Sequence, residues 1–297
     1  MHPFSKVLCA TDLSPHADEA LRQAAAVAGL YSAKLVVFHA MPSPTASSPF
    51  FPQAVLQQNE QFVALERRVL EALHQRVATV IGRGTHVEVV LGSGSPHSAI
   101  VQTAEKAGAD LIVVGGEGPK GVARALLGAV AERVVRYAHS PVWVARAGGG
   151  GGPVVVGTDF SPPATAATEL AVDYARRAQA KLMVVHGLSI EKLVPAPGPP
   201  VDQPAFPTWS MAEIQTMRDA ARTKCSAIAS SAGVEVEVVV NDEAPGKALP
   251  ALASSSAARL ICVGTAGHTG LARVLLGSVA EEIVRKAPCP VLVTRKS

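Results

Sequence analysis

The sequence has no long hydrophobic run and no recognisable export signal. Its apolar runs, such as Leu111–Val114, have the length of a β-strand, whereas a membrane-spanning helix needs about 20 residues. The N-terminal segment, MHPFSKVLCATD, lacks the apolar core and the small-residue cleavage site of a secretory signal. We therefore expect a cytoplasmic protein that does not act at a membrane.

Concentrated charge and paired cysteines are also missing. The formal net charge is +3, with acidic and basic residues interspersed and no basic run carrying aromatic residues, so we do not expect nucleic acid as a partner. The four cysteines form no C-x-x-C pair, and Cys9 and Cys262 lie in apolar, strand-like segments, which indicates buried free thiols. The nine histidines show no metal-ligand spacing, so we predict no protein-built metal site.

What the sequence does contain is a repeat. Residues 115–129, GGEGPKGVARALLGA, match residues 264–278, GTAGHTGLARVLLGS, and the similarity continues to Arg146 and Arg295. Upstream, VLCATDLSP (7–15) matches VVVGTDFSP (154–162), and AKLVVFHA (33–40) matches AKLMVVHG (180–187). We therefore predict two similar domains, residues 1–147 and 154–297, joined by the glycine-rich linker 148–153.

Each half alternates between two hydrophobic periods. Short runs rich in Val, Leu and Ile predict strands that are buried on both faces, and apolar residues spaced three and four apart predict helices between them. Strands alternating with helices imply a parallel sheet. The predicted fold class is α/β: two tandem, doubly wound, five-stranded parallel-sheet domains of flavodoxin or Rossmann-like type, with strand order 3-2-1-4-5. The expected strands of the first half are 6–10, 35–39, 86–91, 111–115 and 141–146.

The repeated glycines follow the fourth strand of each half, where a doubly wound sheet binds its ligands. Gly277 comes immediately before a helix expected from Val279 to about Lys286, and the free N–H groups of a helix start favour an anion. Ser278 adds a hydroxyl, and Asp159, after the first strand of its half, can accept hydrogen bonds from a ribose. The arrangement suits a polyphosphate.

Several of these residues have a structural interpretation as well. Ser278 and Glu281 have the spacing of a capping box, in which the serine serves only its own helix. Asp12 and Asp159 each lie two residues before a serine, as in an Asx turn. Both interpretations stay open at this point.

Other catalytic and binding motifs are absent. The chain has no G-x-x-x-x-G-K-[ST], and no Ser–His–Asp or paired-carboxylate arrangement occurs in both halves, so no residue is a candidate for catalysis. His39 and His186 end the second strand of each half, and we assign them a structural role. Arg124 and Arg273 are either phosphate ligands or solvated charges.

The combination of G-x-x-G, nine residues and G-[S/T] with Asp-x-Ser after the first strand and a closing P-V-x-V strand resembles the universal stress protein family. The resemblance covers nearly the whole chain, as two domains in tandem. It implies a five-stranded α/β fold and, in the ATP-binding branch, bound ATP with a divalent cation, Mg²⁺ or Mn²⁺. It also implies a regulatory or stress-survival role rather than a defined turnover reaction.

The resemblance assigns roles to matching residues in each half. In the second, Asp159 lies at the ribose, Gly187 lies near the adenine, and the phosphates are held by Gly264, Gly267, Gly277, Ser278 and the backbone of Val279. In the first, the matching residues are Asp12, Ala40, Gly115, Gly118, Gly128 and Val130. The first half departs from the motif at Ala129, where the family has Ser or Thr.

We therefore expect a non-enzymatic, ATP-binding protein of the stress response without robust catalytic turnover. Two alternatives stay open: a slow ATPase or adenylyl-transfer enzyme of related fold, and an interaction module that binds no nucleotide. Because Ala129 lacks the hydroxyl of Ser278, we expect one tight ATP per chain, in the second domain.

The fifth strands generate a prediction about assembly. In the order 3-2-1-4-5 the fifth strand is an edge, and residues 141–146 (PVWVAR) and 290–295 (PVLVTR) are short and apolar; such edges are normally paired or covered. We predict that the two fifth strands pair within one chain, and a homodimer is compatible with this. An experimental structure tests it: both strands facing solvent, or each paired with a different chain, would contradict the prediction.

Overall fold

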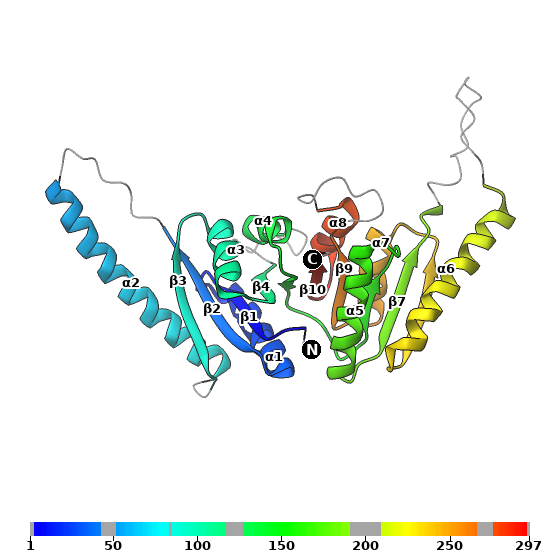
Figure 1. The fold of residues 1–297 in the computed structure, drawn as a ribbon, viewed down its shortest axis with the longest axis horizontal. Coiled ribbons are helices and arrows are strands. Elements are labelled where there is room, and N and C mark those ends of the chain that lie inside the picture. The colour runs from blue at the N-terminus through cyan, green and yellow to red at the C-terminus, as the bar shows by residue number, and fades with distance from the viewer. Residues whose placement is uncertain are drawn as a thin grey trace, which may run out of the picture. The chain divides into compact units, whose positions relative to one another are not determined.

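The computed structural model describes residues 3–42, 52–82, 85–116, 127–190, 209–265 and 276–295, and of residues 52–60 only the helix backbone. The chain forms two compact units, Met1–Ala145 and Arg146–Ser297. Figure 1 labels their helices and strands. Each unit has the same alternation of strand and helix that the repeat predicts.

The first unit contains five strands, four α-helices and one short 3-10 helix in its described residues. They are β1 (Lys6–Ala10), the 3-10 helix Pro15–Ala17, α1 (Asp18–Tyr31), β2 (Lys34–Met41), α2 (Pro52–Ile81), β3 (Val87–Ser93), α3 (Pro96–Ala107), β4 (Leu111–Gly115), α4 (Ala129–Tyr137) and β5 (Val142–Ala145).

The second unit repeats this order, again within the described residues. Its elements are β6 (Val154–Gly157), α5 (Pro162–Arg177), β7 (Leu182–Gly187), α6 (Met211–Ala232), β8 (Val236–Asn241), α7 (Pro245–Ser255), β9 (Leu260–Gly264), α8 (Ser278–Lys286) and β10 (Val291–Thr294).

The strands of each unit form a parallel sheet in the predicted order. In the first unit β1 lies between β2 and β4, with β3 beyond β2 and β5 beyond β4. In the second unit β6 lies between β7 and β9, with β8 and β10 outside them. The predicted fold class and strand order are confirmed.

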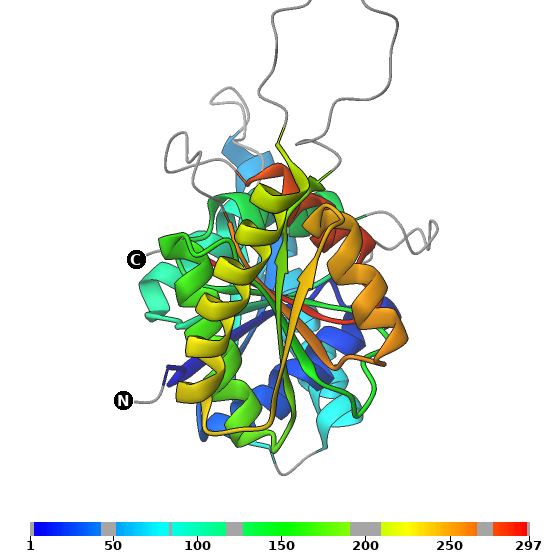
Figure 2. The ribbon, with the colours of Figure 1, turned by 90° about the vertical axis from the view of Figure 1, so that its right-hand side faces the viewer.

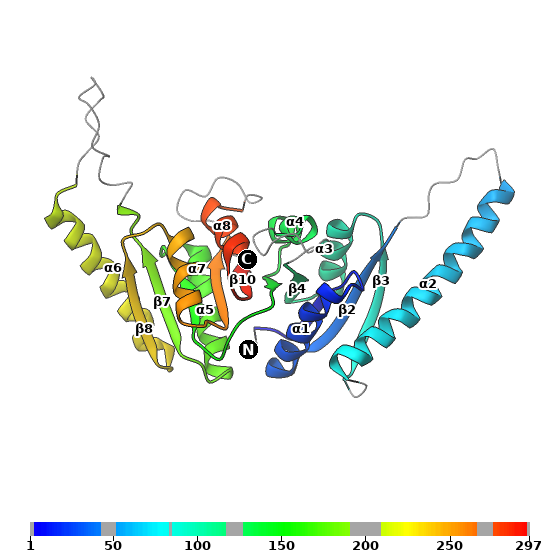
Figure 3. The same cartoon turned by 180° about the vertical axis from the view of Figure 1, so that it is seen from behind.

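Helices cover both faces of each sheet, which is why the central strands are apolar throughout. In the first unit α1 and α2 pack on one face and α3 and α4 on the other (Figures 1 and 3). Figure 2 shows α5 and α6 on one side of the second sheet and α7 and α8 on the other. Val7, Leu8 and Cys9 in β1, like Val154 and Val155 in β6, are fully buried, as expected for central strands of a parallel sheet.

The turn after the first strand of each unit is built in the same way. Leu13 and Phe160 both have a positive φ, 65° and 63°, which non-glycine residues seldom adopt. A threonine hydroxyl two residues earlier accepts a hydrogen bond from the backbone N–H of each, at 3.1 Å from Thr11 to Leu13 and 3.0 Å from Thr158 to Phe160. The hydroxyls stabilise the sharp change of direction from strand to helix.

The glycine-rich segment belongs to the second unit and is attached to it. Arg259 donates hydrogen bonds of 2.9 Å each to the carbonyls of Gly151 and Gly152. A Cβ on Gly148 would lie 2.7 Å from the carbonyl oxygen of Pro288, and Gly148 has a φ of 108°. The glycines therefore let this segment lie against the second unit without steric clash.

All four cysteines are buried free thiols, as the sequence predicts for Cys9 and Cys262. Burial raises the pKa of Cys9 and of Cys289 to about 12, which makes both thiols unreactive because the thiolate is the nucleophile. Of the helices in the described part of the chain, none combines the length and the apolar composition that crossing a membrane requires.

The last residue of β9 must be glycine for a packing reason. A Cβ on Gly264 would lie 2.7 Å from the carbonyl carbon of Pro163 and 2.8 Å from the nitrogen of Ala164, at the start of α5. Gly264 thus lets the strand approach backbone that cannot rotate away.

We predict that Gly264→Ala lowers the free energy of unfolding by about 1–3 kcal/mol, as overpacking does elsewhere. Gly151→Ala is the matched control, because a Cβ at Gly151 meets nothing within 4 Å. Urea denaturation of both variants measures the difference. A Gly264→Ala protein as stable as the control would contradict this account of the glycine.

Candidate functional site

Each unit has a cavity at the carboxyl ends of its first and fourth strands, where the sheet order reverses. The cavity of the second unit has a volume of about 660 Å³, and that of the first about 320 Å³. Ligand sites in proteins measure roughly 300–1,000 Å³, so the second cavity lies well inside this range and the first at its lower limit.

The second cavity is formed by the ends of three strands and the start of one helix. The strand ends contribute Gly157 of β6 and Asp159 just after it, Gly187 of β7, and Gly264 of β9. Helix α8 contributes its N-terminal part, and the neighbouring helix α7 contributes apolar side chains. The lining residues from the N-cap and first two turns of α8 and from α7 are Gly277, Ser278, Val279, Ala280, Ile283, Pro245 and Leu249.

The predicted site residues that the structure describes all line one cavity or the other. In the second unit these are Asp159, Gly187, Gly264, Gly277, Ser278 and Val279. In the first they are Asp12, Ala40, Gly115, Gly128 and Val130. Gly118 and Gly267 lie outside the described residues, as do Arg124 and Arg273.

Both aspartates form the Asx turn that the sequence allowed. The Oδ1 atom of Asp12 accepts a hydrogen bond of 2.9 Å from the N–H of Ser14, and that of Asp159 accepts one of 3.0 Å from Ser161. A carboxylate offers about four acceptor positions, so the turn fixes the side chain without excluding a ligand. Asp159 is half-buried and lines the cavity.

Helix α8 starts without a side-chain cap. Its N-cap residue is Gly277, which has no side chain, and Ser278 is the first residue inside the helix. The capping-box interpretation therefore does not hold, because the serine is one position too late to serve as the cap. The first N–H groups of a helix have no intrahelical partner, so this helix start directs N–H donors and a partial positive charge at the cavity.

Backbone hydrogen bonds close the repeated motif in both units. The N–H of Gly277 donates to the carbonyl of Thr265 at 2.7 Å, and that of Gly128 donates to Gly116 at 3.0 Å. Each bond holds the helix start against the end of the fourth strand. The position of the candidate anion site is thus set by main-chain contacts that do not depend on the residue at 129 or 278.

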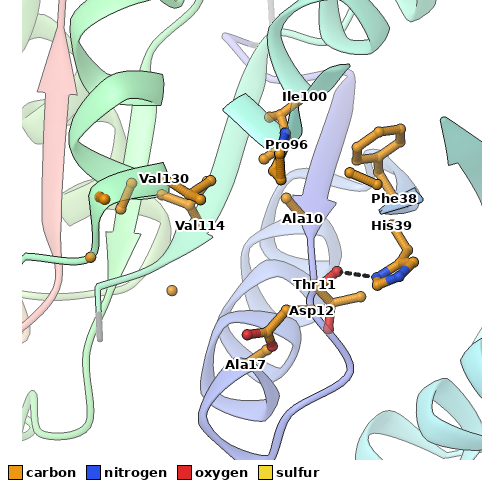
Figure 4. Close-up of a pocket in the computed structure, with 15 residues that line it drawn as sticks. Ala10, Thr11, Asp12, Ala17, Phe38, His39, Pro96, Ile100, Val114 and Val130 are labelled. Atoms are coloured by element: carbon orange, nitrogen blue, oxygen red, sulfur yellow. Dashed lines mark hydrogen bonds between the residues drawn. The ribbon is translucent and has the colours of Figure 1, made fainter. Parts of the chain in front are cut away.

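The two histidines have the structural role assigned to them. The Nδ1 of His186 is 2.7 Å from the carbonyl oxygen of Thr158, and the Nδ1 of His39 is 2.8 Å from that of Thr11 (Figure 4). Each ring ties the end of the second strand to the turn after the first. Phe160 stacks on His186 with ring centroids 4.8 Å apart, and Lys224 lies 5.0 Å from the Phe160 ring.

Sequence reasoning missed the wall that α7 provides. Pro245 and Leu249 lie far from the glycine motif along the chain, and their apolar character resembles that of any core residue. The available signal was Pro96, which has the equivalent place in the first half and also lines its cavity.

The second cavity offers little acid–base chemistry. Of its lining residues in the described chain, only Asp159 has an acidic or basic side chain. Within the described residues, no three His, Cys, Asp or Glu side chains come together as a metal site. The arrangement can bind a ligand through backbone donors, but its wall does not supply a paired acid and base.

Several known proteins are similar to this chain in sequence or in fold. The family model described as "Universal stress protein family" matches residues 3–146 and again residues 152–295. The universal stress protein Rv2623 of Mycobacterium tuberculosis is 30% identical over 302 residues, covering 98% of this chain and 96% of that protein. Rv2005c of the same organism is 29% identical over 301 residues, covering 98% and 97%.

A solved structure agrees with the fold. The crystal structure of a universal stress protein from Archaeoglobus fulgidus superimposes with a TM-score of 0.65 at 20% sequence identity, covering 99% of each chain. The double match of the family model accounts for the internal repeat and for the two similar units. The chain belongs to the universal stress protein family and carries two copies of its domain in tandem.

Proposed function

We propose that the second unit binds ATP and that the protein acts as a nucleotide-dependent regulator in the stress response, without robust catalytic turnover. One observation carries the proposal: an uncapped helix start, the hydroxyl-bearing Ser278 and the carboxylate of Asp159 line the same cavity. Together they match the phosphates and the ribose of one nucleotide.

The helix start is suited to the phosphates. The first-turn N–H groups of α8 and the helix dipole favour an anion, and Ser278 adds a donor at the same place. Thr265 and Gly277, joined by their backbone hydrogen bond, hold this turn against β9. Gly267, outside the described residues, completes the motif in this proposal.

The other end of the cavity is suited to the nucleoside. Asp159 lies at the carboxyl end of β6, where it can accept hydrogen bonds from ribose hydroxyls. Gly187 ends β7, and the alkyl side chains of Leu249, Val263 and Ile283 offer an apolar surface for a flat ring. In this proposal the adenine lies beside β7 and the phosphates lie at the start of α8.

A divalent cation fits the site only as a companion of the phosphates. Mg²⁺ keeps several waters and binds through one or two carboxylates and the phosphates of its nucleotide. Asp159 is the one carboxylate among the described lining residues. Mg²⁺ or Mn²⁺ would neutralise phosphate charge there, with Asp159 as the protein group within the cavity that can assist.

The limited acid–base chemistry favours binding over turnover. Hydrolysis of a phosphoanhydride needs a group that positions or activates water, and the described cavity wall has no second carboxylate and no histidine. We therefore propose a protein that reports nucleotide occupancy, in the cytoplasm where ATP is available. Steady-state phosphate release at a rate comparable with ordinary ATPases would contradict the absence of turnover.

We predict that isothermal titration calorimetry finds one tight ATP per chain and that Ser278→Ala weakens it. A hydrogen bond to a charged oxygen contributes about 1.5–3 kcal/mol, so the Kd should rise about ten- to a hundredfold. Ser278→Thr is the control, because it keeps the hydroxyl and should keep most of the affinity.

A second readout separates binding from folding. Because Ser278 is not the cap of α8, Ser278→Ala should leave the thermal midpoint of the nucleotide-free protein nearly unchanged. An unchanged Kd together with a lowered midpoint would contradict the proposal and restore the serine to a structural role.

A further inference from the structure

The two cavities differ at their floor, the part of the wall formed by the end of the second strand of each unit. In the alignment of VVFHA (36–40) with MVVHG (183–187), Phe38 is equivalent to Val185 and Ala40 is equivalent to Gly187. Phe38 lines the first cavity, whereas Val185 is not among the described residues that line the second. The first cavity has about half the volume of the second, 320 against 660 Å³.

The Phe38 ring occupies the space that a side chain at position 92, on the neighbouring strand β3, would otherwise fill. A Cβ on Gly92 would lie 2.6 Å from Cε2 and 2.8 Å from Cζ of Phe38, so a larger residue at this position would have to displace the ring. Gly92 of β3 is the register partner of Ala40.

In the second unit the larger and the smaller residue are exchanged between the two strands. The register partner of Gly187 is Asn241, so Asn241 has the place of Gly92. There the strand carries the larger residue, whose Oδ1 accepts a hydrogen bond of 2.7 Å from the N–H of Glu243, and β7 carries the smaller Val185. The larger residue thus lies on the second strand in the first unit (Phe38, with Gly92 on the third strand) and on the third strand in the second unit (Asn241, with Val185 on the second strand).

Two further positions narrow the first cavity. In the second unit a Cβ on Gly157 would lie 2.6 Å from Cδ2 of Leu249, and one on Gly187 would lie 2.9 Å from the carbonyl oxygen of Glu243. The first unit has alanine at both equivalents, Ala10 and Ala40, and both line its cavity. Figure 4 shows Ala10, Phe38 and Ile100 around this space.

We propose that Phe38, backed by Gly92, is the residue that excludes purine nucleotides from the first unit. In the described residues the phosphate end of that unit shares two features with the second: an uncapped start of α4 at Gly128 and the closing backbone hydrogen bond. The missing hydroxyl at Ala129 weakens the first site, and the Phe38 ring adds a second barrier that restoring the hydroxyl alone does not remove. This inference rests on the proposed function of the second unit.

The paired variant Val185→Phe/Asn241→Gly gives the second unit the phenylalanine and glycine pair of the first. The new glycine at 241 leaves room for the new ring at 185, as Gly92 does for Phe38 in the first unit, so we expect the variant to keep its packing. Its ATP Kd should rise at least about tenfold, the effect expected when a filled region is overpacked by a ligand. Asn241→Gly alone is the matched control, and it should change the Kd much less.

The reciprocal variant Phe38→Val/Gly92→Asn/Ala129→Ser removes the phenylalanine ring from the wall of the first cavity and adds the hydroxyl that Ala129 lacks. Calorimetry should then find two ATP per chain, whereas Ala129→Ser alone should leave one. Circular dichroism and the thermal midpoint of every variant show that the fold is kept. If the second-unit pair fails to fold, the reciprocal variant decides the matter by itself.

Two results would overturn the inference: an unchanged Kd in folded Val185→Phe/Asn241→Gly, or a second tight site created by Ala129→Ser alone. A reciprocal variant that folds and still binds one ATP would overturn it as well. A wild-type protein that binds no ATP would instead refute the proposed function, so the two failures are distinguishable.

Discussion

The parallel direction of the strands is the constraint on which the rest of this structure depends. Because every strand in a unit points the same way, the ends of the first and fourth strands meet at one edge, and each is followed by a helix start on that edge. Asp159 and Ser278 are far apart in the chain yet line one cavity for this reason. The main chain alone sets most of the site: the bond between Thr265 and Gly277 holds the helix start in place.

Duplication gives the two units the same framework, and a few side chains make them different. The Asx turn, the histidine tie and the uncapped helix start are present in both. What differs is the volume between these parts, about 320 Å³ in the first unit, where Phe38 lines the cavity, and about 660 Å³ in the second. Binding specificity can therefore diverge through packing residues while the phosphate framework is kept.

The fold and much of the site could be predicted from the sequence because they depend on periodic patterns and on a repeat. The alternation of buried strands with helices sufficed for the strand order, and the glycine motif indicated the edge of the sheet that holds the cavity. The role of Gly264 was only partly predicted, because its contact with Pro163 depends on how α5 packs on β9. Phe38 was missed for a similar reason: an aromatic residue in an apolar strand resembles any core residue, and only the strand register pairs it with Gly92.

Hydrogen–deuterium exchange with and without ATP tests most directly the central claim that backbone donors of one helix start bind the nucleotide. The account predicts that ATP slows exchange at the first turn of α8, residues 278–281, and near Asp159, while the first turn of α4, residues 129–132, exchanges as before. Equal protection of both helix starts would contradict the assignment of a single site. Protection of neither, at saturating ATP, would contradict the claim itself.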